Sequence, residues 1–197
     1  MSRTPNSRKE ETHERILDVA ARAIRRHGYA GVGVADVMKE AGLTHGGFYA
    51  HFDSRDALIV EALERAGRES AEAIGRAAAR RTASGASAFR ALVESYLADR
   101  LLATMDAGCP VAALGSDMPR QSPAVREASA LRVQRLVASV RAALPDAPRS
   151  AAAGVVAATL VGSLQLARAL GDNAEGRALL AAARKSLLAQ YDTAASA

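Results

Sequence analysis

Helical periodicity is the feature that most constrains the fold of this chain. Phe89, Leu92, Val93, Tyr96 and Leu97 follow the spacing i, i+3, i+4, i+7, i+8 of a helix with one apolar face. No run of five or more residues alternates in the manner of a strand, and alanine, the best helix former, supplies about a quarter of the chain. We therefore expect an all-α protein of about nine helices.

Glycine, proline and capping residues divide this pattern into successive helices. Gly28 and Gly42 are natural left-handed stops, Ser7 and Glu10 have the spacing of a capping box, and Ser54 is a good N-cap. The predicted helices span about residues 8–27, 34–41, 44–51, 55–80, 86–105, 110–116, 123–144, 149–170 and 174–191.

Composition excludes several classes of protein without identifying a partner. The 197 residues hold one cysteine, which excludes an internal disulfide framework. Residues 1–60 carry nine Lys and Arg against eight Asp and Glu, so the net charge of +5 is not concentrated there and does not by itself indicate nucleic acid. Residues 2–11 lack the apolar stretch of a secretory signal, and we expect a cytoplasmic protein. Residues 150–167 are uncharged but interrupted by glycine and polar residues, which favours a buried helix over a membrane span.

The stretch Gly28 to Leu58 carries the most information about function. Two short predicted helices, joined by a turn at Gly42 and preceded by a longer helix, describe a helix-turn-helix unit. Gly46 and Gly47 fall at the start of the second short helix, where glycine costs about 1 kcal/mol relative to alanine. Bare backbone at this point would allow close approach to DNA, although a plain turn is the simpler interpretation.

Residues 28–58, GYAGVGVADVMKEAGLTHGGFYAHFDSRDAL, resemble the DNA-binding domain of TetR-type (tetracycline-repressor-like) transcriptional regulators. The resemblance implies a three-helix DNA-binding domain over about residues 1–53 and a helical effector-binding and dimerisation domain over 54–197. It also implies a homodimer formed through the last two helices and a small-molecule effector. No cofactor, metal site or membrane association is expected.

The predicted contacts to DNA lie on and around the short helix that begins after Thr44. Hydroxyl, imidazole and guanidinium groups can donate to phosphate oxygens, and glycine exposes backbone. The candidates are Thr44, His45, Gly46, Gly47, Tyr49, His51, Arg55, Gly33 and Lys9, with Arg3 and Arg8 completing a basic N-terminal arm. Thr44 could also be a cap only, and Tyr49 and His51 could pack against the first helix. Gly33 departs from the family, which often has Ser or Thr there.

The C-terminal region resembles the family in architecture only. Candidate effector contacts are the apolar and weakly polar residues Phe89, Leu92, Tyr96, Met105, Cys109, Met118 and Gln165, for each of which core packing is the alternative. They favour an apolar or weakly polar ligand. Cys109 precedes Pro110 at a predicted helix start and could be a reactive thiol or a buried packing residue.

A dimer interface is predicted on the last two helices. Gly154, Ala158 and Gly162 recur every four residues and form a shallow strip against which another helix could pack. Leu180, Ala183, Leu187 and Tyr191 form an apolar face that we expect to match it.

The sequence thus predicts a sequence-specific, ligand-responsive repressor that acts as a homodimer on a pseudo-palindromic operator. Two other functions stay open: a ligand-sequestering protein with a vestigial helix-turn-helix, and an enzyme that uses Cys109. The second lacks support, since no catalytic motif is present and all four histidines lie in the first 51 residues.

Overall fold

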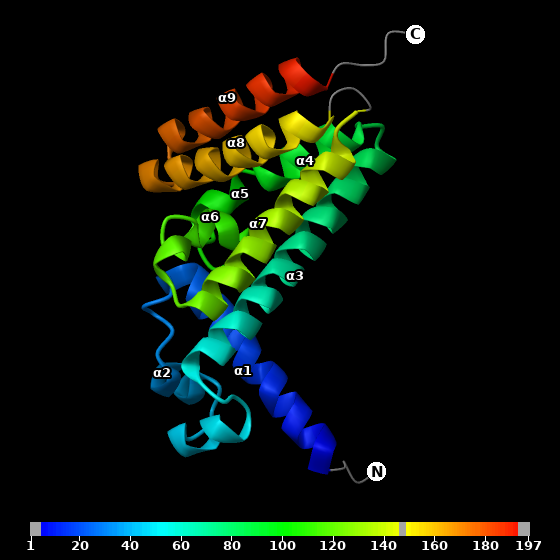
Figure 1. Ribbon diagram of the computed structural model, residues 1–197. Helices are drawn as coiled ribbons and strands as arrows, with labels where there is room; N and C mark the ends of the chain where they lie inside the picture. Colours follow the sequence, from blue (N-terminus) through cyan, green and yellow to red (C-terminus); the bar gives the residue numbers. More distant parts are fainter. Residues whose placement is uncertain (1–4, 146–148, 193–197) are drawn as a thin grey trace.

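The computed structural model describes residues 5–145 and 149–192, and over these residues it is all-helical with no strand (Figure 1). The all-α prediction is confirmed. The α-helices are α1 (Pro5–His27), α2 (Val34–Glu40), α3 (Arg55–Ala83), α4 (Ala88–Tyr96), α5 (Arg100–Ala103), α6 (Pro110–Leu114), α7 (Pro123–Ala143), α8 (Arg149–Leu170) and α9 (Ala174–Tyr191). Two short 3-10 helices are η1 (His45–Ala50) and η2 (Met118–Arg120).

Local signals placed most helix ends correctly, and the exceptions have physical causes. α1 begins at Pro5, ahead of Ser7, so Ser7 is not at the helix N-cap. The helix predicted over 86–105 is broken after Tyr96. At this break a guanidinium from α9 takes up the freed polar groups, since Arg184 donates to the Leu97 carbonyl and, at 2.7 Å, to Asp99.

The long helix α3 joins the two ends of the molecule. In Figure 1, α1, α2 and η1 form the lower lobe, α8 and α9 lie side by side at the top, and α3 runs from one lobe to the other. Its first turns bury Leu58, Ile59 and Leu63 in the same core as α1, and its later turns pack against α4 and α7. Since α3 contributes to both lobes, the division into residues 1–53 and 54–197 stays a prediction.

Two side chains at the end of α1 connect the lower lobe to the upper one. Arg25 is 7% exposed and donates to the Asp106 carbonyl at 2.6 Å and to the Glu69 carboxylate at 2.9 Å. Tyr29, in the turn after α1, shares a buried 2.9 Å hydrogen bond with Ser129 of α7. Removing such contacts would leave buried polar groups without partners, so they hold the lobes in a fixed relation.

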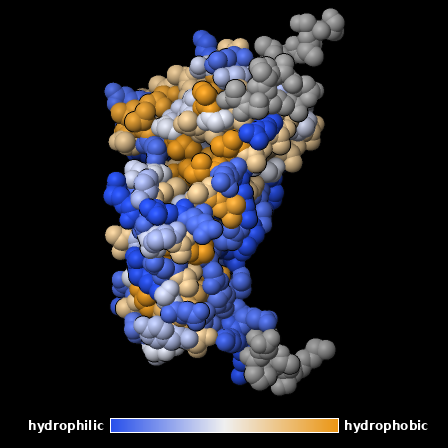
Figure 2. All heavy atoms as spheres, viewed as in Figure 1, coloured by the Kyte–Doolittle hydropathy of each residue, from blue (hydrophilic) through white to orange (hydrophobic). Residues whose placement is uncertain are grey.

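The uncharged helix α8 is buried on one face only, whereas the sequence predicted a buried helix. Its segment Ala152–Leu170 is long and apolar enough to cross a membrane by length and composition, and 33% of that segment is buried inside the subunit. Its inner face is buried as expected. The prediction was wrong for the outer face, on which Val155 and Leu166 are each 60% exposed. Apolar surface also gathers on the upper half of the molecule in Figure 2.

Candidate functional site

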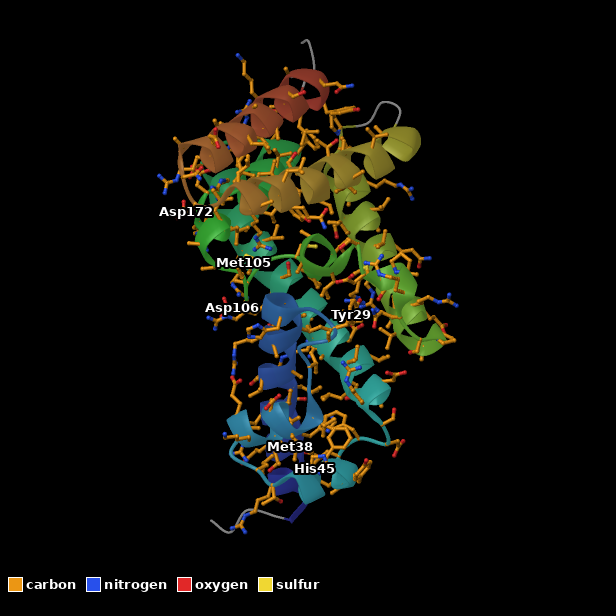
Figure 3. All side chains as sticks on the ribbon, turned by 90° about the vertical axis from the view of Figure 1, so that its left-hand side faces the viewer. Tyr29, Met38, His45, Met105, Asp106 and Asp172 are labelled. Atoms are coloured by element: carbon orange, nitrogen blue, oxygen red, sulfur yellow. The ribbon has the colours of Figure 1, made fainter. Side chains whose placement is uncertain are left out.

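The short helix η1 is displayed at the tip of the lower lobe. Figure 3 places His45 at the end of the molecule opposite Asp172, which lies just before α9. Phe48 anchors η1, since its ring is 1% exposed and stacks on Phe52 with 5.5 Å between the ring centroids. With one side anchored, Thr44, His45, Gly46 and Tyr49 are left exposed on the other. The structure therefore brings the central predicted contact residues onto one outward surface.

Gly46 and Gly47 are not required by the packing of the chain itself. A Cβ atom at Gly46 would meet nothing within 4 Å, and one at Gly47 would make an ordinary 3.7 Å contact with the Met38 methyl group. Neither residue has the positive φ of Gly28 and Gly42, both at +72°, where the chain turns out of α1 and α2. The two η1 glycines therefore expose bare backbone to whatever lies outside the molecule.

Thr44 and Tyr49 make few contacts with the rest of the subunit through their polar groups. Thr44 occupies the N-cap position, but its hydroxyl makes no capping hydrogen bond, and its carbonyl instead accepts from the Gly47 amide at 3.1 Å. The expected side-chain cap is therefore absent, and the hydroxyl is available to a partner. Tyr49 is 70% exposed and touches Phe48 edge-on, at 5.2 Å between ring centroids. Its ring is therefore accessible to a partner outside the subunit.

His51 lies beside the first turns of α1 rather than on the tip. Its ring centroid is 6.0 Å from that of His13, and its Nδ1 is buried without a hydrogen-bond partner among the described residues. Burial lowers the pKa of His51 below its usual value, and the nearby His13 and Lys9 lower it further. Lys9 of the predicted arm is exposed on α1. Arg8 is exposed, and Arg3 lies outside the described residues.

Arg55 and Gly33 have internal contacts that the sequence did not reveal. The Arg55 guanidinium donates to the Val32 carbonyl at 2.9 Å and to the Tyr29 carbonyl, so it fixes the turn before α2. At Gly33, a Cβ atom would lie 3.0 Å from the Asp36 carboxylate. That carboxylate already faces the start of α2, where it complements the helix dipole.

A cavity of about 480 Å³ lies in the upper lobe among α3, α4, α6 and α7. Three of the predicted effector contacts line it: Leu92, Tyr96 and Cys109. The side chains that the sequence analysis missed come mainly from α3 and α7, among them Glu64, Arg68, Ile74, Arg132, Arg135 and Leu136. No single helix period could reveal them, because the cavity forms only where these separate helices meet.

The other four predicted effector contacts lie elsewhere. Phe89 is 1% exposed and packs against Tyr191, at 6.0 Å between ring centroids. Met105 is 43% exposed. It lies on the loop before α6, where Figure 3 labels it. Met118 is buried in η2, and Gln165 points towards Gly115; neither lines the cavity.

The small-residue strip on α8 faces outwards, but its expected match on α9 faces inwards. A Cβ atom at Gly154 or Gly162 would meet nothing within 4 Å. By contrast, Leu180 and Leu187 are 0% and 3% exposed within the subunit, where they pack in the core shared with α8 and α4. The apolar face predicted on α9 therefore stabilises the subunit, and that part of the dimer prediction was wrong. Exposed small residues, including Ala178 and Ala182, form the outer face of α9.

A three-helix unit that displays a short helix with bare backbone, carried by a helical C-terminal lobe, defines the class of helix-turn-helix regulators. Residues 16–62 match the family model described as bacterial regulatory proteins, tetR family. The HTH-type transcriptional regulator Rv0196 of Mycobacterium tuberculosis is 30% identical over 173 residues, which cover 81% of this chain and 85% of that protein. The chain belongs to the TetR family of transcriptional regulators, a family of DNA-binding proteins and not of enzymes.

Solved structures agree with this assignment at the level of the fold. The reduced form of Escherichia coli NemR has a TM-score of 0.74 at 19% identity, covering 94% of this chain and 99% of that one. A TetR transcriptional regulator from Chloroflexus aurantiacus has a TM-score of 0.72 at 21% identity, covering 92% and 94%. The similarity thus extends through the C-terminal lobe, where the sequence resemblance is weak.

Proposed function

We propose that the protein is a homodimeric, ligand-responsive repressor that binds a pseudo-palindromic operator in the cytoplasm. The observation that carries the DNA contact is η1, which is anchored by Phe48 and presents Gly46 with open space before it and Gly47 beside it. In such a regulator this helix enters the major groove, and a two-fold dimer reads two half-sites about one helical turn apart.

The residues around η1 would then divide between groove and backbone contacts. Thr44, His45, Gly46 and Gly47 are on the side that would face base edges, and Tyr49 would donate to a phosphate. His51 and Lys9 would contact the backbone on the side of α1. Arg55 and Gly33 would act indirectly, because Arg55 holds the turn that carries α2.

The outer face of α8 would form the dimer interface together with the outer face of α9. Val155 and Leu166 are each 60% exposed, and they flank the open positions of Gly154 and Gly162. Apolar side chains around a strip without Cβ atoms suit the close packing of a second helix. A dimer would also remove from water the face of α8 that gives this helix its membrane-like composition.

An effector in the cavity would reach the DNA-binding lobe through two hydrogen-bonded contacts. Cys109 and Val111 line the cavity, and Asp106 on the same loop accepts from Arg25 of α1. Arg132 lines it from α7, one turn after Ser129, which bonds to Tyr29. Regulation requires the effector to bind one arrangement of these helices more tightly than the other.

The test is a binding-site selection from random DNA, followed by fluorescence anisotropy of the selected duplex at several salt concentrations. We expect sequence-selective, salt-dependent binding that falls at least tenfold in Tyr49→Ala. Arg126→Ala removes an exposed guanidinium on α7, outside the helix-turn-helix unit; it is the control and should bind normally. A protein without selective DNA binding would favour the sequestering alternative and contradict the proposal.

A further inference from the structure

The cavity is apolar over most of its wall but carries an excess of guanidinium groups. Three arginines, Arg68, Arg132 and Arg135, line it together with two carboxylates, Glu64 and Glu72. Glu72 pairs with Arg76 outside the cavity, and Arg68 is in no ion pair with the described residues. Glu64 alone therefore neutralises both Arg132 and Arg135.

Arg132 is the most deeply buried of these cations. Its side chain is 5% exposed and lies across α3 at Gly67, where a Cβ atom would overlap the guanidinium. Nη2 is 2.8 Å from the Glu64 carboxylate, yet no N–H of Nη2 is aligned for a hydrogen bond with a described residue. Glu64 meanwhile accepts a well-formed 2.6 Å hydrogen bond from Arg135. The cavity thus contains a buried cation with unused donor capacity.

Tyr96, which lines the cavity, carries a second polar group without a well-formed hydrogen bond. Its side chain is 1% exposed, and its hydroxyl lacks a well-formed hydrogen bond although the Cys109 thiol is close. Burial raises the pKa of Tyr96 well above its usual value, so the phenol stays protonated and can donate. Arg168, which fixes the loop before α6, adds positive potential near this hydroxyl.

We propose that the cavity binds an apolar anion, of the carboxylate or phenolate class, whose charged oxygen accepts from Arg132. Tyr96 provides a further donor, and the apolar body of the ligand lies along Ile74, Leu92 and Leu136. The inference rests on the proposed ligand response and specifies its chemistry. A neutral apolar ligand would leave the Tyr96 hydroxyl without an acceptor and Arg132 Nη2 with only the poorly aligned Glu64 carboxylate. A cation would face three guanidinium groups.

The test uses matched probes that differ only in their polar end. Calorimetric titration of the full chain compares decanoate with decanol and decylamine, and naphthoate with naphthalenemethanol. We expect at least one of the acids to bind about tenfold or more tightly than its matched neutral compound. Equal binding of acid and alcohol in both series, tighter binding of the amine, or no binding of either acid would overturn the proposal.

Substitutions then test whether Arg132 causes the preference for acids over alcohols. Arg132→Met should reduce the ratio of acid to alcohol affinity to about one, whereas Arg126→Met on the same helix should keep it. Should Arg132→Met not fold, the double variant Glu64→Gln with Arg132→Met decides, because it removes the buried cation together with its carboxylate. An unchanged ratio in the variant that folds contradicts the assignment.

Glu64→Gln alone should change the affinity for acids in the opposite direction from Arg132→Met. A general loss of structure would lower the affinity in both variants. Without the carboxylate that competes for Arg132, acids should bind severalfold more tightly while alcohols are unaffected. Weaker acid binding in this variant would count against the proposal.

Measuring DNA binding of the same samples without probe distinguishes a failure of the anion cavity from a failure of the proposed DNA-binding function. A protein that binds its operator but ignores the acids disproves only the anion cavity. One that binds acids but no DNA disproves only the proposed function.

Discussion

Two surfaces at opposite ends of the molecule carry pairs of glycines that the fold does not need. A Cβ at Gly46 on η1, or at Gly154 or Gly162 on α8, would meet nothing within 4 Å. Gly176 is the opposite case, since a Cβ there would overlap the Gly171 carbonyl and lie 2.9 Å from that of Ala167. A glycine enclosed by its own chain is explained by packing. The open glycines on η1 and α8 leave room for something outside the subunit, which we propose is DNA at η1 and a second copy at α8.

The largest effect should come from placing a charge on the proposed dimer surface. Leu166→Glu puts a carboxylate where two copies of α8 would pack, so we expect a monomer whose operator affinity falls about 100-fold. Light scattering and anisotropy measure the two quantities. Leu131→Glu is the matched control, because Leu131 is a 39% exposed leucine on α7, and this variant should stay dimeric.

Gly176→Ala should lower the free energy of unfolding by about 2 kcal/mol, because its methyl group overlaps backbone that cannot move aside cheaply. Gly162→Ala should leave the unfolding free energy of the subunit unchanged within about 0.5 kcal/mol. Urea denaturation of a monomeric Leu166→Glu background compares the two directly. Equal losses at both positions would break the distinction between enclosed and open glycines.

Gly46→Ala should weaken operator binding about tenfold while the fold keeps its stability, since the added methyl group meets DNA and not protein. Gly75→Ala on α3, measured without effector, is the control, because a Cβ there also meets nothing within 4 Å and Gly75 lies on the cavity rather than on η1. Normal DNA binding by Gly46→Ala would show that the bare backbone of η1 has no role in the contact.

The smallest effect concerns the protonation of His51. Because folding lowers its pKa, the unfolded chain binds the proton more readily. The contribution of His51 to stability is therefore present above its unfolded pKa of about 6.5 and is lost as pH falls from there through the lowered value. Urea denaturation at pH 5.5 and 7.5 should show this change in the native chain and a smaller one in His51→Gln.

A phosphate beside His51 would raise its pKa again, so operator binding should tighten about threefold between pH 7.5 and 6. His13 also lies in this region, with its Nε2 2.9 Å from the Glu61 carboxylate, so the difference between the native chain and His51→Gln is the relevant quantity. The same pH dependence in both proteins would exclude a contact between His51 and phosphate.

The helix-turn-helix unit was more predictable than the cavity, for a physical reason. Gly28 and Gly42 stop their helices through their own backbone freedom, and Ser54 caps α3 by accepting from the Ala57 amide at 3.1 Å. These signals act within a few residues and can be found in the sequence. The cavity depends on the Arg132 side chain of α7 lying across Gly67 of α3. No pattern within a few residues of sequence can predict a contact between two separate helices.

The sequence by itself determined that the chain is helical, where α8 and α9 begin and end, and which short helix carries the family resemblance. Tertiary structure decided that Leu180 and Leu187 face inwards, that Arg55 holds a turn, and that the long helix predicted after residue 86 breaks where Arg184 reaches the Leu97 carbonyl. Periodicity shows that a helix has an apolar face. Only the packing of distant helices decides whether that face meets the subunit's own core or a partner.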